Sequence, residues 1–393
     1  MASIRKRSWK TNRGETKTGW FVDYYDQHGK RQRKQFTRKK NADAFALTAQ
    51  LEVRDGTHIA EVDSITVSEA GEAWIKTAAQ GTADRDPLER STCEQYQQHL
   101  DLHIAPLIGN LKLSKLNVPV IRDFADTLRA TGRSSVMVKY VIRSLGSLLS
   151  DAQERGHIIR NPVHELRRKR RKRGNSHDGR GSNLKVGINI PTPDEIKAIL
   201  QAVTGKNRAL LLTAVFTGLR ASELRGLPWK HGVDLKRGEL HVIQRADRFR
   251  EIGKPKTRAA ERTIPLPSPV VAALREWRLA CPKGALGLVF PDESGGVEYL
   301  VNIVQQILWP VQVAAGVVTN TGAPKYTGLH SLRHFYASWC INRKVDGGLE
   351  LPPKVVQHRL GHSSITVTMD TYGHLFPRGD DSNELAAAAS SLL

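Results

Sequence analysis

Near the start of the chain, a short run of aromatic and β-branched residues at 20–25 is expected to be a β-strand. Turn residues at 27–30 follow it, and we expect a second strand at 30–36 and a third at 4–9. Thr37 can cap a helix that extends to about residue 54, and its apolar face would consist of Ala44, Ala46, Leu47 and Leu51. The pattern predicts a three-stranded sheet backed by one helix, as a unit over residues 1–61.

Further along the chain, apolar residues recur about every 3.6 positions, which indicates helices. Four stretches have this spacing: 66–78, 91–103, 118–130 and 134–155. Pro106 and Gly109 separate the second helix from the third, and Asn161-Pro162 ends the series. We expect a helical domain over residues 65–165.

Seven consecutive cations follow: Arg167, Arg168, Lys169, Arg170, Arg171, Lys172 and Arg173. Like charges repel one another, so this run and the Gly/Ser/Asn-rich stretch after it are expected to be an extended linker over 166–187. Two interpretations stay open together, a solvated linker and a strap that lies along phosphates.

From residue 188 to the end, the pattern predicts mixed helices and short strands, beginning with a helix that Thr192 caps. The segment 384–393 is rich in Ala and Leu and is helix-prone. The predicted fold class is therefore a multidomain chain, mainly α with small β-sheets, ending in a mixed α+β domain over 188–393.

The chain of 393 residues has 60 Lys and Arg against 39 Asp and Glu, a formal charge of +21. Such a surplus attracts polyanions, and the basic runs lack the apolar face that a membrane-surface helix needs. Arg31, Arg33 and Lys34 on the third expected strand are candidate DNA contacts, although an ordinary basic sheet surface is the alternative. No run of about 18 apolar residues is present, and no apolar stretch follows the basic N-terminus. With three separated cysteines as well, we expect a cytoplasmic, nucleoid-associated protein.

The C-terminal region contains five polar motifs whose order matters more than any one of them. They are TGLRASEL (217–224), PKT with RTIPL (255–266), HSLRH (330–334), LGHSS (360–364) and TY (371–372). Arg220 and Glu223 alone would be an ordinary surface pair one helical turn apart. Lys254 or Lys256 would lie near the tip of an expected hairpin, with Lys256 preferred.

The succession of these motifs closely resembles the tyrosine recombinase (phage integrase) family. The resemblance implies a catalytic domain over 188–393, a helical core-binding domain over 65–165 and, less specifically, an arm-type DNA-binding domain at 1–61. It also implies a site-specific recombinase that cuts and rejoins DNA through a 3′-phosphotyrosyl bond and integrates or excises a phage or mobile element. A chromosome-dimer resolvase or DNA-relaxing enzyme of the same family and a non-catalytic DNA-binding protein are the alternatives.

The resemblance implies a role for each site residue. Tyr372 would be the nucleophile, with Tyr336 as the fallback, and His330 the base that receives its proton. Lys256 would protonate the leaving 5′-oxygen, since an alkoxide leaves poorly without a proton. The remaining residues would act around the phosphate: Arg220 and Arg333 on its oxygens, His362 as a hydrogen-bond donor, Glu223 orienting the arginines, and His334 either supporting them or packed in the core.

The implied partners are double-stranded DNA with core-type and arm-type attachment sites, a homotetramer, an excisionase and a DNA-bending host factor. The segment 379–393 would pack on a neighbouring subunit, or on its own subunit. We expect no cofactor and no metal, because the sequence has no GxxxxGK[ST] loop and no carboxylate cluster with divalent-metal spacing.

Overall fold

The computed structural model describes residues 2–10, 16–26, 29–54, 63–166, 184–255, 257–376 and 389–390. They belong to two compact units, Met1–Asp178 and Gly179–Leu393. Lys256, the seven cations at 167–173 and most of the segment 379–393 lie outside the described residues. Among the helices that are described, none has the length and apolarity to cross a membrane.

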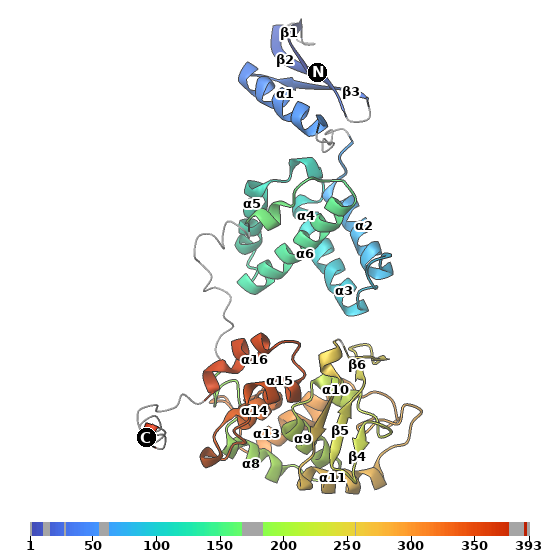
Figure 1. Cartoon of the computed structure of the whole chain (residues 1–393), viewed down its shortest axis with the longest axis vertical. Coiled ribbons are helices and arrows are strands. Elements are labelled where there is room, and N and C mark those ends of the chain that lie inside the picture. Colours follow the sequence, from blue (N-terminus) through green and yellow to red (C-terminus); the bar gives the residue numbers. More distant parts are fainter. Residues whose placement is uncertain are drawn as a thin grey trace. The chain divides into compact units, whose positions relative to one another are not determined.

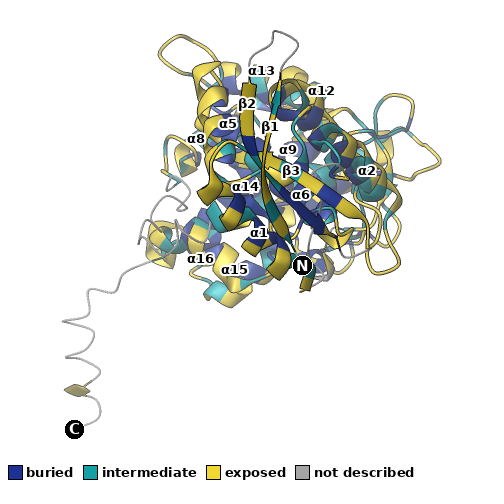
Figure 2. Cartoon of the chain, turned by 90° about the horizontal axis from the view of Figure 1, so that it is seen from above, coloured by how far each residue is buried: buried dark blue, intermediate teal, exposed yellow. Residues whose placement is uncertain are grey.

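The first unit begins with the predicted three-stranded antiparallel sheet in the order β1-β2-β3. Its strands are β1 (Ser3–Lys10), β2 (Thr16–Tyr25) and β3 (Arg31–Phe36). The helix α1 (Lys39–Arg54) lies against the sheet (Figure 1). Most of the buried residues of the sheet are in β2, whereas β1 and β3 are largely exposed (Figure 2). The fold of this segment was predicted correctly.

The apolar face predicted for α1 was wrong except at Ala46. Its buried residues are the three alanines at 42, 46 and 49, and Leu47 and Leu51 are 62% and 44% exposed. Val22 and Tyr24 of the sheet and the side chain of Phe45 already fill this small core, so only alanine lets the helix backbone approach the sheet.

Residues 65–165 of the first unit are mainly helical, as predicted. Its principal helices are α2 (Val67–Gln80), α3 (Arg90–His99), α5 (Val118–Ala130) and α6 (Ser135–Glu154). Between α3 and α5 the chain passes through a π-helical turn (Leu100–Ile104) and the short α4 (Ala105–Ile108). Side-chain caps fix three of the starts, because Thr66, Asn117 and Ser134 each accept a hydrogen bond from a backbone N–H of the first turn.

The second unit contains a core of aliphatic and aromatic residues that is larger than the core of the N-terminal sheet. Its longer helices are α8 (Pro193–Ala202), α9 (Lys206–Thr217), α11 (Ser268–Ala280), α14 (His330–Ile341), α15 (Pro353–Leu360) and α16 (Ile365–Tyr372). Short helices lie between them: α10 (Ala221–Arg225), α12 (Leu300–Asn302) and α13 (Trp309–Ala314), the last two joined by a π-helical turn (Ile303–Leu308). Thr192 caps α8 as predicted, with Glu195 completing a capping box.

Two small antiparallel sheets complete this unit. One has the order β4-β5-β8, with β4 (Val233–Asp234), β5 (Glu239–Val242) and β8 (Arg262–Pro265). The other pairs β6 (Arg245–Ala246) with β7 (Ile252–Gly253). The prediction that residues 262–266 form a hairpin with the segment before them was wrong, because β7 pairs with β6 and β8 pairs with β5.

Candidate active site

Tyr372 is the last residue of α16, and its side chain is buried, with 1% exposed. Its hydroxyl lies 2.8 Å from Nδ1 of His334. The ring of His362 stacks on the tyrosine ring, with centroids 6.2 Å apart and planes 5° from parallel. The tyrosine side chain therefore meets two imidazoles on different segments, one at its hydroxyl and one at its ring.

The helix α14 contributes three residues to the same region. Arg333 and His334 follow His330 by three and four residues, about one helical turn, so both lie near the side of the helix that carries His330. Arg333 is 2% exposed and donates to the backbone oxygens of Gly218 and Leu360, at 2.6 Å each. Burial, followed by the charge of Arg220, lowers the pKa of Arg333 to about 10, so it remains a cation at neutral pH.

Arg220 lies at the start of α10, where Glu223 reaches back to it. One carboxylate oxygen accepts from the Arg220 backbone N–H and the other from its Nη1, both at 2.8 Å. The preceding glycine, Gly218, has φ +60° at the end of α9, and a Cβ there would lie 2.3 Å from the Tyr336 ring. This close approach requires glycine in the motif and fixes the path of the chain into Arg220.

Glu223 also binds a second arginine that our sequence analysis missed. The side chain of Arg262 is fully buried and donates to both oxygens of Glu223, at 3.1 and 2.9 Å. Burial opposes ionisation of Glu223, but the hydrogen bond and charge of Arg262, with the charge of Arg220, outweigh it and lower the pKa of the carboxyl. Glu223 thus lies against two guanidiniums. Because the charge of Arg262 neutralises that of the carboxylate, the positive charge of Arg220 remains available to an anionic ligand.

The sequence contained a signal for Arg262. Residues of a strand alternate between two faces, and Arg262 shares a face with Ile264, which is fully buried in β8. A cation on the buried face of a strand needs a buried carboxylate partner.

Three arginines converge on the end of α15. Its last carbonyls have no partner within the helix, and Gly361 ends it in the left-handed conformation with φ +63°. Arg262 donates to the oxygen of Arg359 at 2.8 Å, Arg333 to that of Leu360, and Arg220 to that of Gly361 at 3.0 Å. His362 follows directly, so one helix end positions three guanidiniums and a histidine.

The histidines of the cluster are held uncharged. Burial, then the charges of Arg333 and Arg220, lowers the pKa of His362 to about 4. Burial, then His330 and Arg333, lowers the pKa of His334 to about 4 as well. The side chain of His330 is exposed, and desolvation by its neighbours with the charges of Arg333 and Arg220 lowers its pKa too. Burial raises the pKa of Tyr372 to about 12, although Arg333 and Arg220 oppose the rise.

The structure brings seven of the predicted residues into one cluster: Arg220, Glu223, His330, Arg333, His334, His362 and Tyr372. Lys256, the predicted acid, lies outside the described residues, as do the seven predicted linker cations. Tyr336, the fallback nucleophile, is buried in the core. Within the described part of the chain, no group of His, Cys, Asp or Glu could hold a metal ion.

The predicted basic residues of β3 belong to the first unit. Arg31 and Arg33 both bind Oδ1 of Asp23, at 3.2 and 2.8 Å. Nζ of Lys34 lies 4.7 Å from the centroid of the Phe45 ring. The arginines keep 56% and 43% of their side chains exposed, so they can still meet a ligand.

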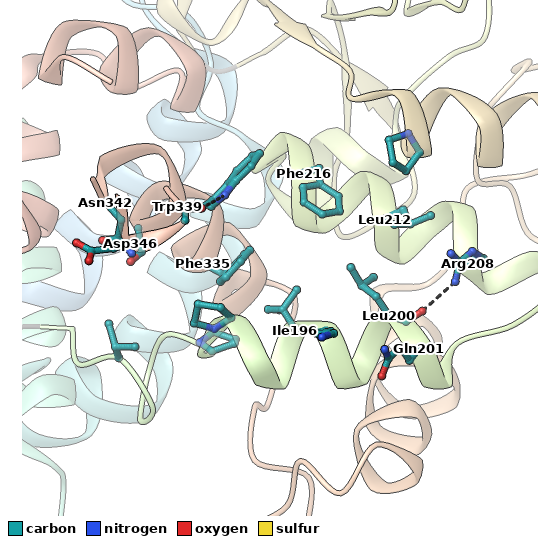
Figure 3. A pocket seen from close by; sticks show the side chains of 17 residues that line it. Ile196, Leu200, Gln201, Arg208, Leu212, Phe216, Phe335, Trp339, Asn342 and Asp346 are labelled. Carbon is teal, nitrogen blue, oxygen red and sulfur yellow. Dashed lines mark hydrogen bonds between the residues drawn. The ribbon is translucent and has the colours of Figure 1, made fainter. Parts of the chain in front are cut away.

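An apolar groove of about 450 Å³ lies on the other side of α14 (Figure 3). Phe335 and Trp339 of α14 face it, together with Ile196 and Leu200 of α8. Among the residues that the structure describes, no predicted site residue lines it.

Comparisons with known proteins show which family and which solved structures the chain is similar to. The model of the phage integrase family matches residues 190–378, and that of the phage integrase N-terminal SAM-like domain matches residues 85–129. The chain is 27% identical over 382 residues to a tyrosine recombinase XerC-like protein of Caldanaerobacter subterraneus, covering 90% of each chain. It is 23% identical over 299 residues to the ICEBs1 integrase of Bacillus subtilis, covering 75% of this chain and 76% of that one.

Two solved structures share the fold. The Tn1549 transposon integrase in complex with a circular intermediate DNA has a TM-score of 0.62 at 20% identity, covering 84% of this chain and 100% of that one. The lambda integrase tetramer bound to a Holliday junction has a TM-score of 0.54 at 18% identity, covering 94% of each chain.

Proposed function

Because the chain belongs to the tyrosine recombinase (phage integrase) family of enzymes that cut and rejoin DNA, we propose that it integrates or excises a phage or mobile element through a 3′-phosphotyrosyl bond at Tyr372. The observation that carries this proposal is the convergence of Arg220, Arg333, His362 and Tyr372 at the end of α15. A phosphodiester is an anion, and this cluster combines two cations with a tyrosine hydroxyl.

The guanidiniums supply the electrostatic part of catalysis. A guanidinium has five N–H groups, and the hydrogen bonds described above use two of those of Arg220 and two of those of Arg333. Further donors can therefore bind the non-bridging oxygens, where charge grows in the transition state. The neutral His362 adds a donor without adding charge.

The covalent step forms one bond and breaks another. The Tyr372 oxygen attacks phosphorus while its proton passes to a histidine of α14, which the sequence analysis assigned to His330. The bond from phosphorus to the 5′-oxygen breaks, and Lys256 protonates that oxygen. Attack by a different 5′-hydroxyl reverses these steps and reseals the DNA without ATP.

The proposed partner is double-stranded DNA, bound at core-type sites by residues 65–165 and 188–393 and at arm-type sites by residues 1–61. The net charge of +21 and the DNA complexes of the structural relatives support this. The lambda integrase tetramer on a Holliday junction supports a tetramer. We place the protein in the cytoplasm at the nucleoid, with the linker 166–187 along phosphates and an excisionase and a bending protein as accessory factors.

A chromosome-dimer resolvase of the same family is the second candidate, because several relatives are named XerC, including one 31% identical over 222 residues in Xylella fastidiosa. That match covers 64% of the relative and 56% of this chain. Both candidates would cut and rejoin DNA through a phosphotyrosyl bond. They differ in whether the N-terminal sheet binds arm-type sites.

Tyr372→Phe should abolish the covalent protein–DNA adduct while DNA binding stays near the wild-type level, because only the attacking oxygen is lost. A labelled suicide substrate that traps the cleaved state measures both quantities. Tyr336→Phe is the matched control and should still form the adduct. An adduct in the Tyr372 variant, or its loss in the Tyr336 variant alone, would place the nucleophile elsewhere.

Lys256→Ala should cut on the order of 10²–10⁴-fold more slowly, because an alkoxide leaves poorly without a proton. Sulfur in place of the 5′-oxygen leaves as an anion, so this variant should cut the sulfur substrate at nearly the wild-type rate. Arg220→Ala, which removes a guanidinium from the non-bridging oxygens, should gain no such rescue in single-turnover assays. Equal rescue of both variants, or none, would exclude Lys256 as the acid.

A further inference from the structure

The hydroxyl of Tyr372 points at His334, not at His330. Its oxygen lies 2.8 Å from Nδ1 of His334, and both side chains are largely removed from solvent. His330 contacts the ring of His334 edge-on, with centroids 4.5 Å apart. The histidine beside the reacting oxygen is therefore the second one of the HSLRH motif.

We propose that His334 is the base that receives the proton of Tyr372 during DNA cleavage. This inference rests on the proposed function and deepens it, since it concerns the same tyrosine. In the forward step the O–H bond of Tyr372 breaks, its oxygen bonds to phosphorus, and Nδ1 of His334 gains the proton. On resealing, His334 returns that proton as the phosphotyrosyl bond breaks.

The packing around His334 fixes the direction of Nδ1. Its ring meets His330 at 84° on one side and Tyr372 at 64° on another, with the tyrosine centroid 5.7 Å away. The neighbouring Arg333 is anchored to two carbonyls from two other segments, which holds this turn of α14 in place. A ring fixed in this way pre-orients the tyrosine oxygen at no entropic cost in the transition state.

The charge state of the site suits this role. The neutral imidazole has one protonated nitrogen, so with its hydrogen on Nε2 it accepts from the tyrosine at Nδ1. The charged and titratable groups around it are His330 and Arg333 on α14, Tyr372 on α16, and Arg220 and His362 beyond the tyrosine. A bound phosphate offsets the arginine charges that disfavour imidazolium, so DNA binding makes His334 a stronger base.

The test compares His334→Asn with His330→Asn on the sulfur substrate, where the leaving group needs no proton. Asparagine can accept the tyrosine hydrogen bond, but it cannot take the proton. We expect the single-turnover rate of the His334 variant to fall on the order of 10²–10⁴-fold at neutral pH and then to rise about tenfold per pH unit, as Tyr372 must ionise beforehand. The wild type and the His330 variant should keep a flatter pH profile, whatever the rate of the latter.

A steep profile for the His330 variant with a flat one for the His334 variant would overturn the inference. Adduct formation by the wild type is the control for the proposed function. If the wild type forms no adduct, both the proposed function and the role of His334 are refuted. A second measurement leaves His334 intact: in protein with ¹⁵N-labelled histidines, Tyr372→Phe should shift one ring-nitrogen resonance. If no histidine resonance shifts, the hydrogen bond is absent and the inference fails.

Discussion

His334 and His362 are imidazoles buried among cationic neighbours, and both are uncharged in the folded protein at neutral pH. A buried neutral histidine lets the site hold several arginines without further repulsion. The same arrangement makes the fold sensitive to acid, because the unfolded chain can protonate these rings more easily than the folded chain can.

The stability of the chain should therefore fall on mild acidification. Both rings take up protons near the ordinary pKa of 6.5 when unfolded and near about 4 when folded, so the unfolded state binds more protons between these values. We expect the urea midpoint to decrease as the pH falls from about 7 to about 4.5. The carboxyl of Glu223, with its pKa below the ordinary 4.5, loses its charge only at still lower pH.

The control for this effect is the double variant His334→Gln/His362→Gln, which has no imidazole at either position. Its urea midpoint should change less over the same pH range, whatever its stability at neutral pH. An identical pH dependence in both proteins would show that other groups cause the loss.

At the scale of elements, Arg262 links three of them. It donates from β8 to Glu223 of α10 and to the carbonyl of Arg359 at the end of α15. Because this side chain is fully buried, its removal leaves a carboxylate and a carbonyl without their partner in a dry environment.

Arg262→Met should lower the free energy of unfolding by about 3–5 kcal/mol, as expected when one partner of a buried ion pair is removed. Adding Glu223→Gln should recover part of this loss, because no buried charge then remains unpaired. Arg275→Met is a suitable control, since Arg275 is exposed and donates to one carbonyl, that of Leu235 at 2.9 Å. Urea unfolding measures all three, and equal losses at the two arginines would refute the role of burial.

Local rules predicted most of the elements. Apolar spacing predicted α2, α5 and α6, and the caps of Thr66, Asn117 and Ser134 explain where these helices start. The buried face of α1 and the pairing of β7 depend on which distant segment each element meets, and no local pattern contains that information. Strand alternation marks Arg262 as buried, but its partners at 223 and 359 are distant in sequence, so no local pattern identifies them.

The family motifs mark the residues of the candidate site directly, and seven of the described ones lie in one cluster, while the role of each stays a prediction. The sequence could not show which histidine meets the tyrosine. His330 and His334 lie on the same side of α14, and the position of α16 decides between them.

At the scale of the whole molecule, the N-terminal sheet has a core of its own, with Val22, Tyr24 and three alanines of α1. Deleting residues 1–61 should therefore leave cleavage of a short core site intact and stop recombination of a full attachment site. A plot of the logarithm of the binding constant for the full site against the logarithm of the salt concentration should also become shallower. Its slope should change by roughly 0.9 for each phosphate that residues 1–61 neutralise in the full-length chain.

Gel-shift and recombination assays at several salt concentrations measure both effects, with the full-length chain as the reference. Unchanged full-site recombination by the shortened chain would instead favour a resolvase that needs no arm sites. Failure to cleave the core site would show that the deletion harms the rest of the molecule.

The end of α15 has an evolutionary consequence. Arg220, Arg262 and Arg333 come from distant parts of the sequence, yet they donate to three successive carbonyls, one each, and two of them share Glu223. The effect of replacing any one of them depends on whether the others are present, because residues that share partners do not contribute additively. Substitutions at these positions are therefore epistatic, and a lineage that loses one arginine loses much of the selection that retains the other two.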